Sequence, residues 1–286
     1  MACKNPPFAT THGQHFATIG ETSKPMHTKS TARSHAVVPA SLPTAFLTLG
    51  LSMAVPLAAW GQGCLAKSDD VPPAVVELYT SEGCSSCPPA DQWLSTLRGK
   101  EGVLALSFHV NYWNHLGWKD PFATEATTQR QHQIKQALGA AYVYTPQVLL
   151  NGKDHRLWRL GGTLGLAPLP AGAAPGVQLQ RVGSQVTARV APAPAHPSLA
   201  AYWAVLQDGL ANRVTRGENA GETLRHDHVV SYYQPVPSWP GQAGQVLQLT
   251  VPTLPAAQTG TAQRIVLVVT DNTLTQPVQA VALSCS

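Results

Sequence analysis

Short apolar runs alternate with helix-like segments in the middle of the chain. Residues 74–80 (AVVELYT) are a β-branched and aromatic run that ends at turn residues, which predicts a buried strand. Prolines followed by apolar residues at helical spacing predict a helix over residues 88–97, which Gly99 closes. The nearly unbroken apolar run 103–110 is typical of a parallel strand covered on both faces. We therefore expect a strand–helix–strand unit here.

The next segments extend this unit. Residues 124–138 have the composition of a second helix, which ends at Gly139. Residues 144–150 combine a turn-initiating proline with a short apolar strand, and Asn151-Gly152 is a hairpin signal. We expect an α/β domain over residues 74–160.

The pattern changes in the second half of the chain. Residues 161–176 are rich in Gly, Pro and Ala and are predicted to be a linker. Strand-like runs without helical periodicity follow, which favours a mainly antiparallel, β-sandwich-like domain over residues 177–286. These runs are 177–190, 200–206, 229–233, 246–251, 265–269 and 278–283.

The N-terminus predicts export. Lys29 and Arg33 precede an apolar run at residues 45–59, which is the order of a secretory signal. That run is too short to favour a membrane span, so we expect cleavage and no stable membrane span afterwards. The leader with its signal is assigned to residues 1–66, with the cleavage position inside this range not predicted and translation expected to begin at Met26. The mature protein would then be periplasmic or secreted.

Length and charge refine this interpretation. A chain of 286 residues suits two domains, and its 12% charged content is typical of a packed protein rather than a disordered one. Part of the formal charge of +4 comes from the leader, and no basic stripe interleaved with aromatic residues follows it. We therefore expect no nucleic-acid partner.

Four cysteines remain once a leader containing Cys3 is removed, an even number in an oxidising compartment. Cys84 and Cys87 are expected to pair with each other. Cys64 and Cys285 then either form a disulfide that ties the ends of the mature chain together or stay unpaired. Cys64 also allows lipidation, although residues 60–63 lack the small apolar pattern that this needs.

The Cys84-Ser85-Ser86-Cys87 motif can carry redox chemistry. A cysteine at a helix N-terminus has its thiolate stabilised by the helix dipole and by free N–H groups, which makes Cys84 the expected nucleophile. Cys87, one turn further on, is the expected resolving thiol that releases a bound partner. This reading requires a Cys84 sulfur that solvent can reach.

Three segments carry a family resemblance: VELYTSEGCSSCPPAD, SFHVNYWNHLGWKDPF and YTPQVLLNG. They are similar to a family of bacterial secreted proteins of unassigned function with a thioredoxin-like fold, and residues 74–155 resemble the thioredoxin superfamily. The resemblance implies a thioredoxin-like fold for the first domain. It also implies a cis peptide at Pro146, where Thr145 and Pro146 would bind a partner chain beside the cysteines; the alternative is an ordinary trans turn.

Other features leave the chemistry open. The resemblance implies that Glu77 is a buried acid that relays protons to Cys87, but Glu77 could equally lie at a solvated edge. Gly83 stands where the superfamily usually has Trp, and the Ser-Ser dipeptide is also unusual, so the direction of electron flow is not predicted. Asp91, in the first helical turn, is expected to compensate the helix dipole.

Further candidates lie outside the motif. Trp113 and Trp118 could form an apolar rim for a partner, although packing against the core is favoured. His109 and His115 could join the two cysteines in a metal site, but redox pairing already accounts for the cysteines, so no metal is expected. His226 and His228 form an H-x-H pair without a clear third ligand, which favours a surface hairpin.

These observations favour an exported thiol–disulfide oxidoreductase-like protein that uses Cys84 and Cys87 on protein thiols or disulfides, with no cofactor. The alternative is a non-enzymatic periplasmic binding or assembly module, in which the cysteine pair is a structural disulfide or holds a metal and the β-rich domain does the recognition.

Overall fold

The computed structural model describes residues 3–4, 63–163, 165–254 and 263–285. The predicted signal at residues 45–59, the start at Met26 and nearly all of the leader therefore lie outside the described residues. None of the helices in the described part of the chain is long and apolar enough to cross a membrane.

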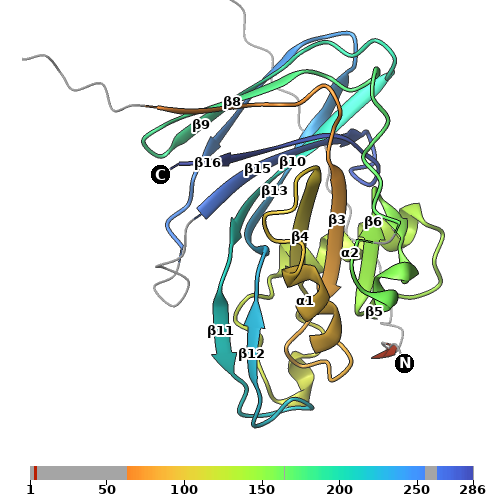
Figure 1. Cartoon of the computed structure of the whole chain (residues 1–286), viewed down its shortest axis with the longest axis vertical. Coiled ribbons are helices and arrows are strands. Elements are labelled where there is room, and N and C mark those ends of the chain that lie inside the picture. The colour runs from red at the N-terminus through yellow and green to blue at the C-terminus, as the bar shows by residue number, and fades with distance from the viewer. Residues whose placement is uncertain (1–2, 5–62, 164, 255–262, 286) are drawn as a thin grey trace, which may run out of the picture. The chain divides into compact units, whose positions relative to one another are not determined.

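The largest element of the fold is an eight-stranded mixed sheet (Figure 1). Strands β3 and β4 are parallel, with Ala74 opposite Val103, and β6 pairs antiparallel with the other edge of β3. Strand β13 joins the free edge of β4 through the pairing of Val229 with Ser107. In spatial order the strands are β16 (Pro277–Ser284), β15 (Gln263–Asp271), β10 (Ser198–Gln207), β13 (Val229–Pro240), β4 (Val103–His109), β3 (Ala74–Thr80), β6 (Gln147–Leu150) and β7 (Lys153–Asp154).

The remaining strands form smaller sheets. A four-stranded antiparallel sheet has the order β14 (Gln245–Thr250), β9 (Gln185–Val190), β8 (Val177–Val182) and β2 (Cys64–Lys67). Its apolar residues share one buried cluster with residues from β10, β15 and β16, so the two sheets pack face to face. Two-stranded pairs are formed by β11 (Leu210–Arg213) with β12 (Thr223–His226), and by β1 (Cys3–Lys4) with β5 (Tyr144–Thr145).

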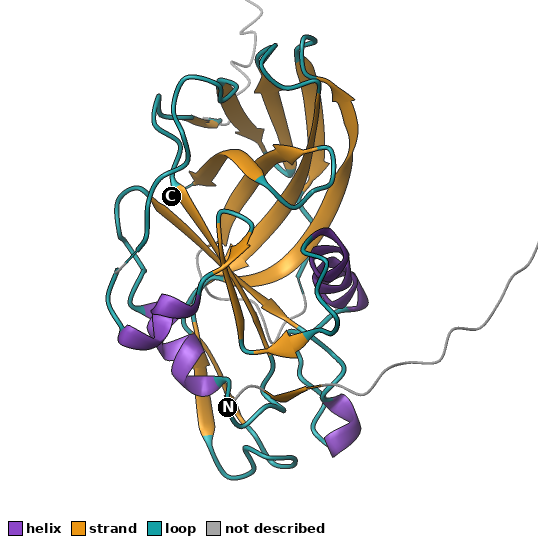
Figure 2. Cartoon of the chain, turned by 90° about the vertical axis from the view of Figure 1, so that its right-hand side faces the viewer, coloured by secondary structure: helices purple, strands orange, loops and turns teal. Residues whose placement is uncertain are grey.

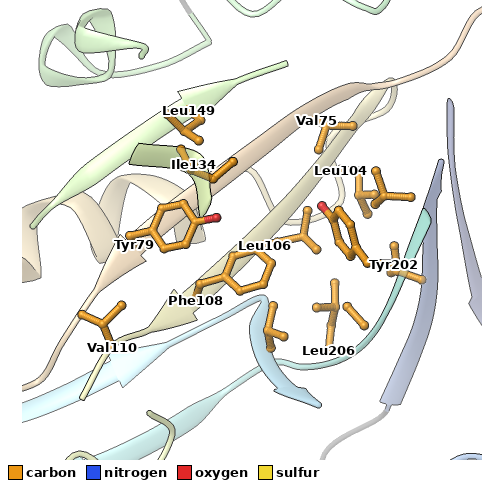
Figure 3. Packing of buried hydrophobic residues seen from close by; sticks show 14 of the residues in the cluster. Val75, Tyr79, Leu104, Leu106, Phe108, Val110, Ile134, Leu149, Tyr202 and Leu206 are labelled. Carbon is orange, nitrogen blue, oxygen red and sulfur yellow. The ribbon is translucent and has the colours of Figure 1, made fainter. Parts of the chain in front are cut away.

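Helices cover both faces of the β3–β4 pair (Figure 2). Helix α1 (Pro88–Ser95) packs Trp93 and Leu94 against the face that carries Val76 and Leu78. Helix α2 (Glu125–Ala137) packs Ile134 against the opposite face, where the aromatic rings of β3, β4 and β10 meet (Figure 3). Two short 3-10 turns are η1 (Asn114–Leu116) and η2 (Arg156–Leu160).

The expected fold class, an α/β thioredoxin-like domain followed by a β-sandwich-like domain, is wrong. Strands account for 43% of the described residues and helices for only 14%, so this part of the protein is mostly β. The predicted α/β segment does not form a sheet of its own, because β13 pairs with β4 and extends the sheet into β10, β15 and β16. An edge strand leaves unpaired N–H and C=O groups, and this pairing satisfies the N–H of Ser107, which donates to the His228 carbonyl at 2.8 Å. The domain boundaries expected at residues 160 and 176 stay a prediction.

Cys64 and Cys285 form a disulfide, which answers the question that the sequence left open. It joins β2 to the segment after β16 across 221 positions of sequence, with the two Cα atoms 5.7 Å apart. Cross-links of this kind stabilise a fold by about 2–4 kcal/mol, chiefly by restricting the unfolded chain.

Candidate functional site

The Cys-Ser-Ser-Cys motif occupies the turn between β3 and α1. Two backbone hydrogen bonds shape this turn. The N–H of Cys84 donates to the carbonyl of Ser81, and the N–H of Cys87 donates to the carbonyl of Cys84. Pro88 and Pro89 fill the first helical positions, so Cys87 is the N-cap and Cys84 lies three residues before it. The nucleophile expected at the helix N-terminus is therefore in the preceding turn.

The two cysteines are free thiols in this structure rather than the expected disulfide, and their electrostatic environments are opposite. A hydrogen bond from the Cys87 side chain lowers the pKa of Cys84 to about 6, against burial, with help from Ser86 and Thr145. The Cys84 sulfur lies 3.3 Å from the Ser86 hydroxyl oxygen and 3.9 Å from the Thr145 carbonyl oxygen. Burial, the neighbouring Cys84 and the Asp91 carboxylate raise the pKa of Cys87. This asymmetry suits one attacking and one resolving thiol.

Access to Cys84 differs from the expectation, since its exposed fraction is 0%. Residues 214–222, between β11 and β12, form hydrogen bonds with the motif and the residues just before it. We call them the covering segment. The Asn219 amide donates to the carbonyls of Glu82 and Cys84, at 2.8 and 3.1 Å. The backbone N–H of Ser85 donates to a carboxylate oxygen of Glu218 at 2.9 Å. The expectation of a sulfur in contact with solvent is therefore wrong for this conformation.

Thr145 and Pro146 lie beside the cysteines, as the resemblance implied, and the peptide bond between them is cis. Trp113 is buried and donates from its ring nitrogen to the Thr145 hydroxyl at 2.8 Å. It therefore packs inside the site rather than forming an exposed rim. Trp113 also explains Gly83, because a Cβ at that position would lie 2.9 Å from the Cβ of Trp113.

Glu77 is buried, one of the two expected alternatives, but its contacts lead away from the cysteines. Its carboxylate forms an ion pair with Arg130 at 2.5 Å and accepts hydrogen bonds from the hydroxyls of Tyr79 and Tyr202. The Arg130 guanidinium also lies 4.1 Å from the centre of the Tyr202 ring. These contacts indicate a role in stability rather than a proton relay to Cys87.

A second polar cluster lies behind the motif and is almost completely buried. His226 Nε2 lies 3.1 Å from a Glu82 carboxylate oxygen, and His109 Nδ1 lies 2.8 Å from an Asp120 carboxylate oxygen. Although burial lowers the pKa of His226, the carboxylates of Asp91 and Glu82 outweigh it and raise this pKa to about 10. The cluster is thus a site that favours positive charge.

Sequence patterns indicated only parts of this cluster. His115 is exposed and bonds to the Tyr112 carbonyl, so the structure does not bring it to His109. His226 and His228 are both buried, which corrects the expected surface hairpin. His228 has a left-handed backbone and contacts Arg264 and Asp208. His226, in contrast, contacts Glu82 and Asp91. Asp91, expected only to compensate the helix dipole, faces His226.

The fold and the site together define the class of this protein. It is mostly β, with a buried dithiol next to a buried histidine–carboxylate cluster. The chain belongs to the family described as "Protein of unknown function (DUF1223)", whose model matches residues 75–270. It is similar to the crystal structure of protein AGR_C_4864 from Agrobacterium tumefaciens, with 29% identity, a TM-score of 0.53, and coverage of 73% of this chain and 93% of that one. HBP35 of Porphyromonas gingivalis matches at 16% identity and a TM-score of 0.46, over 75% of this chain and 76% of that one. No curated protein matches the chain.

Proposed function

We propose that this protein is an exported, periplasmic or secreted thiol–disulfide oxidoreductase that acts on protein partners through Cys84 and Cys87. The observation that carries the proposal is the asymmetry of the two thiols, since the pKa of Cys84 is lowered to about 6 and that of Cys87 is raised. A pair with two buried, protonated thiols would have no such preference for one attacking sulfur. The local set of strand, cysteine pair, helix and cis-proline also resembles the site of the thioredoxin superfamily, although the overall fold differs.

The reaction follows from this asymmetry. The Cys84 thiolate attacks one sulfur of a partner disulfide, forms a mixed disulfide and releases the other partner sulfur as a thiolate. Cys87 then loses its proton and attacks the Cys84 sulfur, which releases the second partner thiol and leaves a Cys84–Cys87 disulfide. The partner gains the two electrons that the dithiol loses. The reverse sequence oxidises a partner dithiol.

A cavity next to Pro146 offers room for a partner chain. Its volume is about 350 Å³, and Tyr142, Tyr144, Arg156 and Trp158 line it together with Pro146. Tyr142 is 43% exposed, so an aromatic surface is available at the mouth of this cavity. Aromatic and Arg side chains are the residue types that dominate binding energy at protein interfaces.

The complete burial of Cys84 requires one further step, and in this proposal residues 214–222 move to open a way to the sulfur. Two side chains hold this segment to the motif, Asn219 and Glu218. Loss of these hydrogen bonds frees the segment from the backbone of residues 82–85. The covering segment therefore acts as a gate in this proposal.

A trapping experiment tests the proposal. The reduced Cys87→Ser protein, mixed with a disulfide-bonded peptide, is expected to accumulate a mixed disulfide at Cys84, because the resolving thiol is gone. Mass spectrometry of the intact protein measures the adduct, and Cys84→Ser is the matched control that should form none. A Cys87→Ser protein that forms no adduct above this control would contradict the proposal.

Removing the gate's bonds gives a separate prediction. Asn219→Ala deletes two buried hydrogen bonds to the motif, so alkylation of Cys84 by iodoacetamide at a fixed pH is expected to become about tenfold faster. The exposed Glu222, on the same segment, provides the control variant Glu222→Gln, whose rate should stay close to that of the unmodified protein. Equal rates for Asn219→Ala and Glu222→Gln would show that these bonds do not limit access.

The complete burial of Cys84 favours one other function. In a binding or assembly module, the cysteine pair would be a structural element and the covering segment would never open. The reduction potential separates the two functions, since structural disulfides lie below about −300 mV and catalytic ones lie higher. A potential in the structural range, together with failed trapping, would support the module.

A further inference from the structure

Behind the cysteine motif, Asp91, His109 and His226 come from helix α1 and strands β4 and β12 and meet in one buried place. One ligand atom from each lies within 4.8 Å of the other two. Their exposed fractions are 6%, 0% and 2%. Two imidazoles and one carboxylate are a ligand set that binds divalent transition metals such as Zn²⁺. We propose that these three residues form a binding site for a divalent transition-metal cation, independent of the thiol chemistry at Cys84.

The free nitrogens of the two histidines support this site. His109 Nε2 and His226 Nδ1 are buried and have no hydrogen-bond partner among the described residues. A buried polar atom without a partner costs about 1–3 kcal/mol, so each such atom calls for a water molecule, an ion or a role in function. His226 Nδ1 lies 3.8 Å from Asp91 Oδ1, too far for a hydrogen bond but suited to two ligands of one ion.

The other ring nitrogens are held as in known metal sites. His109 Nδ1 is paired with the Asp120 carboxylate and His226 Nε2 with the Glu82 carboxylate, at 2.8 and 3.1 Å. Metal-bound histidines commonly donate their second N–H to a carboxylate, which fixes the tautomer and aims the free lone pair at the ion. Asp91 is oriented in the same way, because its second oxygen accepts a hydrogen bond from the Thr80 hydroxyl at 2.9 Å.

The charge balance of the cluster also calls for a cation. Glu82, Asp91 and Asp120 are buried carboxylates, and within the described part of the chain no Lys or Arg forms an ion pair with any of them. The basic side chains paired with these carboxylates are His109 and His226. A divalent ion supplies the missing charge and allows both imidazoles to be neutral ligands.

A cavity reaches two of the three proposed ligands. A cavity of about 170 Å³ is lined by Asp91 and His226 together with Pro88, Gln92 and residues 223–225. Atoms that share a tetrahedral Zn²⁺ lie about 3.4 Å apart, so closing the site needs side-chain shifts of about 1 Å. The cavity leaves room for a water molecule as a fourth ligand.

The experiment uses the full chain with both motif cysteines replaced by serine, so that thiols cannot bind metal. Chelator-treated protein is titrated with ZnCl₂ by calorimetry, and bound zinc is counted by mass spectrometry. We expect one Zn²⁺ per chain. Asp91→Asn and His226→Gln should each weaken binding by on the order of 100-fold or more, and the supporting Glu82→Gln by about 10–100-fold.

His115→Gln is the matched control, because His115 is exposed and lies outside the cluster, and its affinity should stay unchanged. Thermal unfolding in chelator shows whether each variant folds, and Asp91→Asn keeps the shape of the side chain. Equal affinities of Asp91→Asn, His226→Gln and His115→Gln would overturn the proposal, as would a folded cysteine-free protein that binds no zinc. Neither result would affect trapping at Cys84, so the two proposals fail separately.

Discussion

Replacing Arg130 by methionine is expected to lower the free energy of unfolding by about 3–5 kcal/mol. The guanidinium is 1% exposed and is the positive partner of the Glu77 carboxylate, which is 2% exposed. Without it, a carboxylate is left in the core beside the rings of Tyr79 and Tyr202 with no cation to balance it. Denaturant unfolding, with both proteins extrapolated to zero denaturant, measures the loss.

A double variant and a surface control make this measurement specific. Glu77→Gln combined with Arg130→Met removes both charges, so part of the lost stability should return. Arg98→Met breaks the ion pair with Asp227, but Arg98 is 61% exposed, so a change below about 1 kcal/mol is expected. Effects of Arg130→Met and Glu77→Gln that simply add in the double variant would show that the pair is not coupled.

Alkylation of Cys84 is expected to follow an ionisation near pH 6. Because the pKa of Cys84 is lowered to about 6, its thiolate predominates above that pH and is lost as the pH falls below it. The rate should therefore drop about tenfold per pH unit below pH 6 and be flat from pH 7 upward. At pH 7 the thiolate fraction is roughly 100 times that of a thiol with the ordinary value of 9.0. Iodoacetamide kinetics between pH 4 and 9 measure the profile.

The hydrogen bond from Cys87 is the largest cause of this shift, which provides the control. In Cys87→Ala the bond is gone, so the inflection should move upward toward the ordinary thiol value. An inflection above pH 8 in the unmodified protein would contradict the proposed asymmetry of the pair.

The elements around the motif could be predicted because local patterns decide them. The strand expected at residues 74–80 is β3, residue for residue, since its β-branched and aromatic side chains fit a strand buried on both faces. The expected helix over residues 124–138 is α2, shorter by one residue at each end, and a Thr124–Thr127 capping box sets its start. The hairpin at Asn151-Gly152 forms because both residues adopt positive φ.

The sequence by itself determined these strands and helices and the cysteine pair, because they depend on neighbours a few positions apart. Only the tertiary structure decided how the strands combine into one sheet, since the pairing of Val229 with Ser107 joins residues more than a hundred positions apart and has no local signal. The same holds for Asp91, His109 and His226, which meet only because β12 packs beside α1. It also holds for the burial of Cys84, which lies in one core cluster with residues of the distant strands β10, β13 and β15.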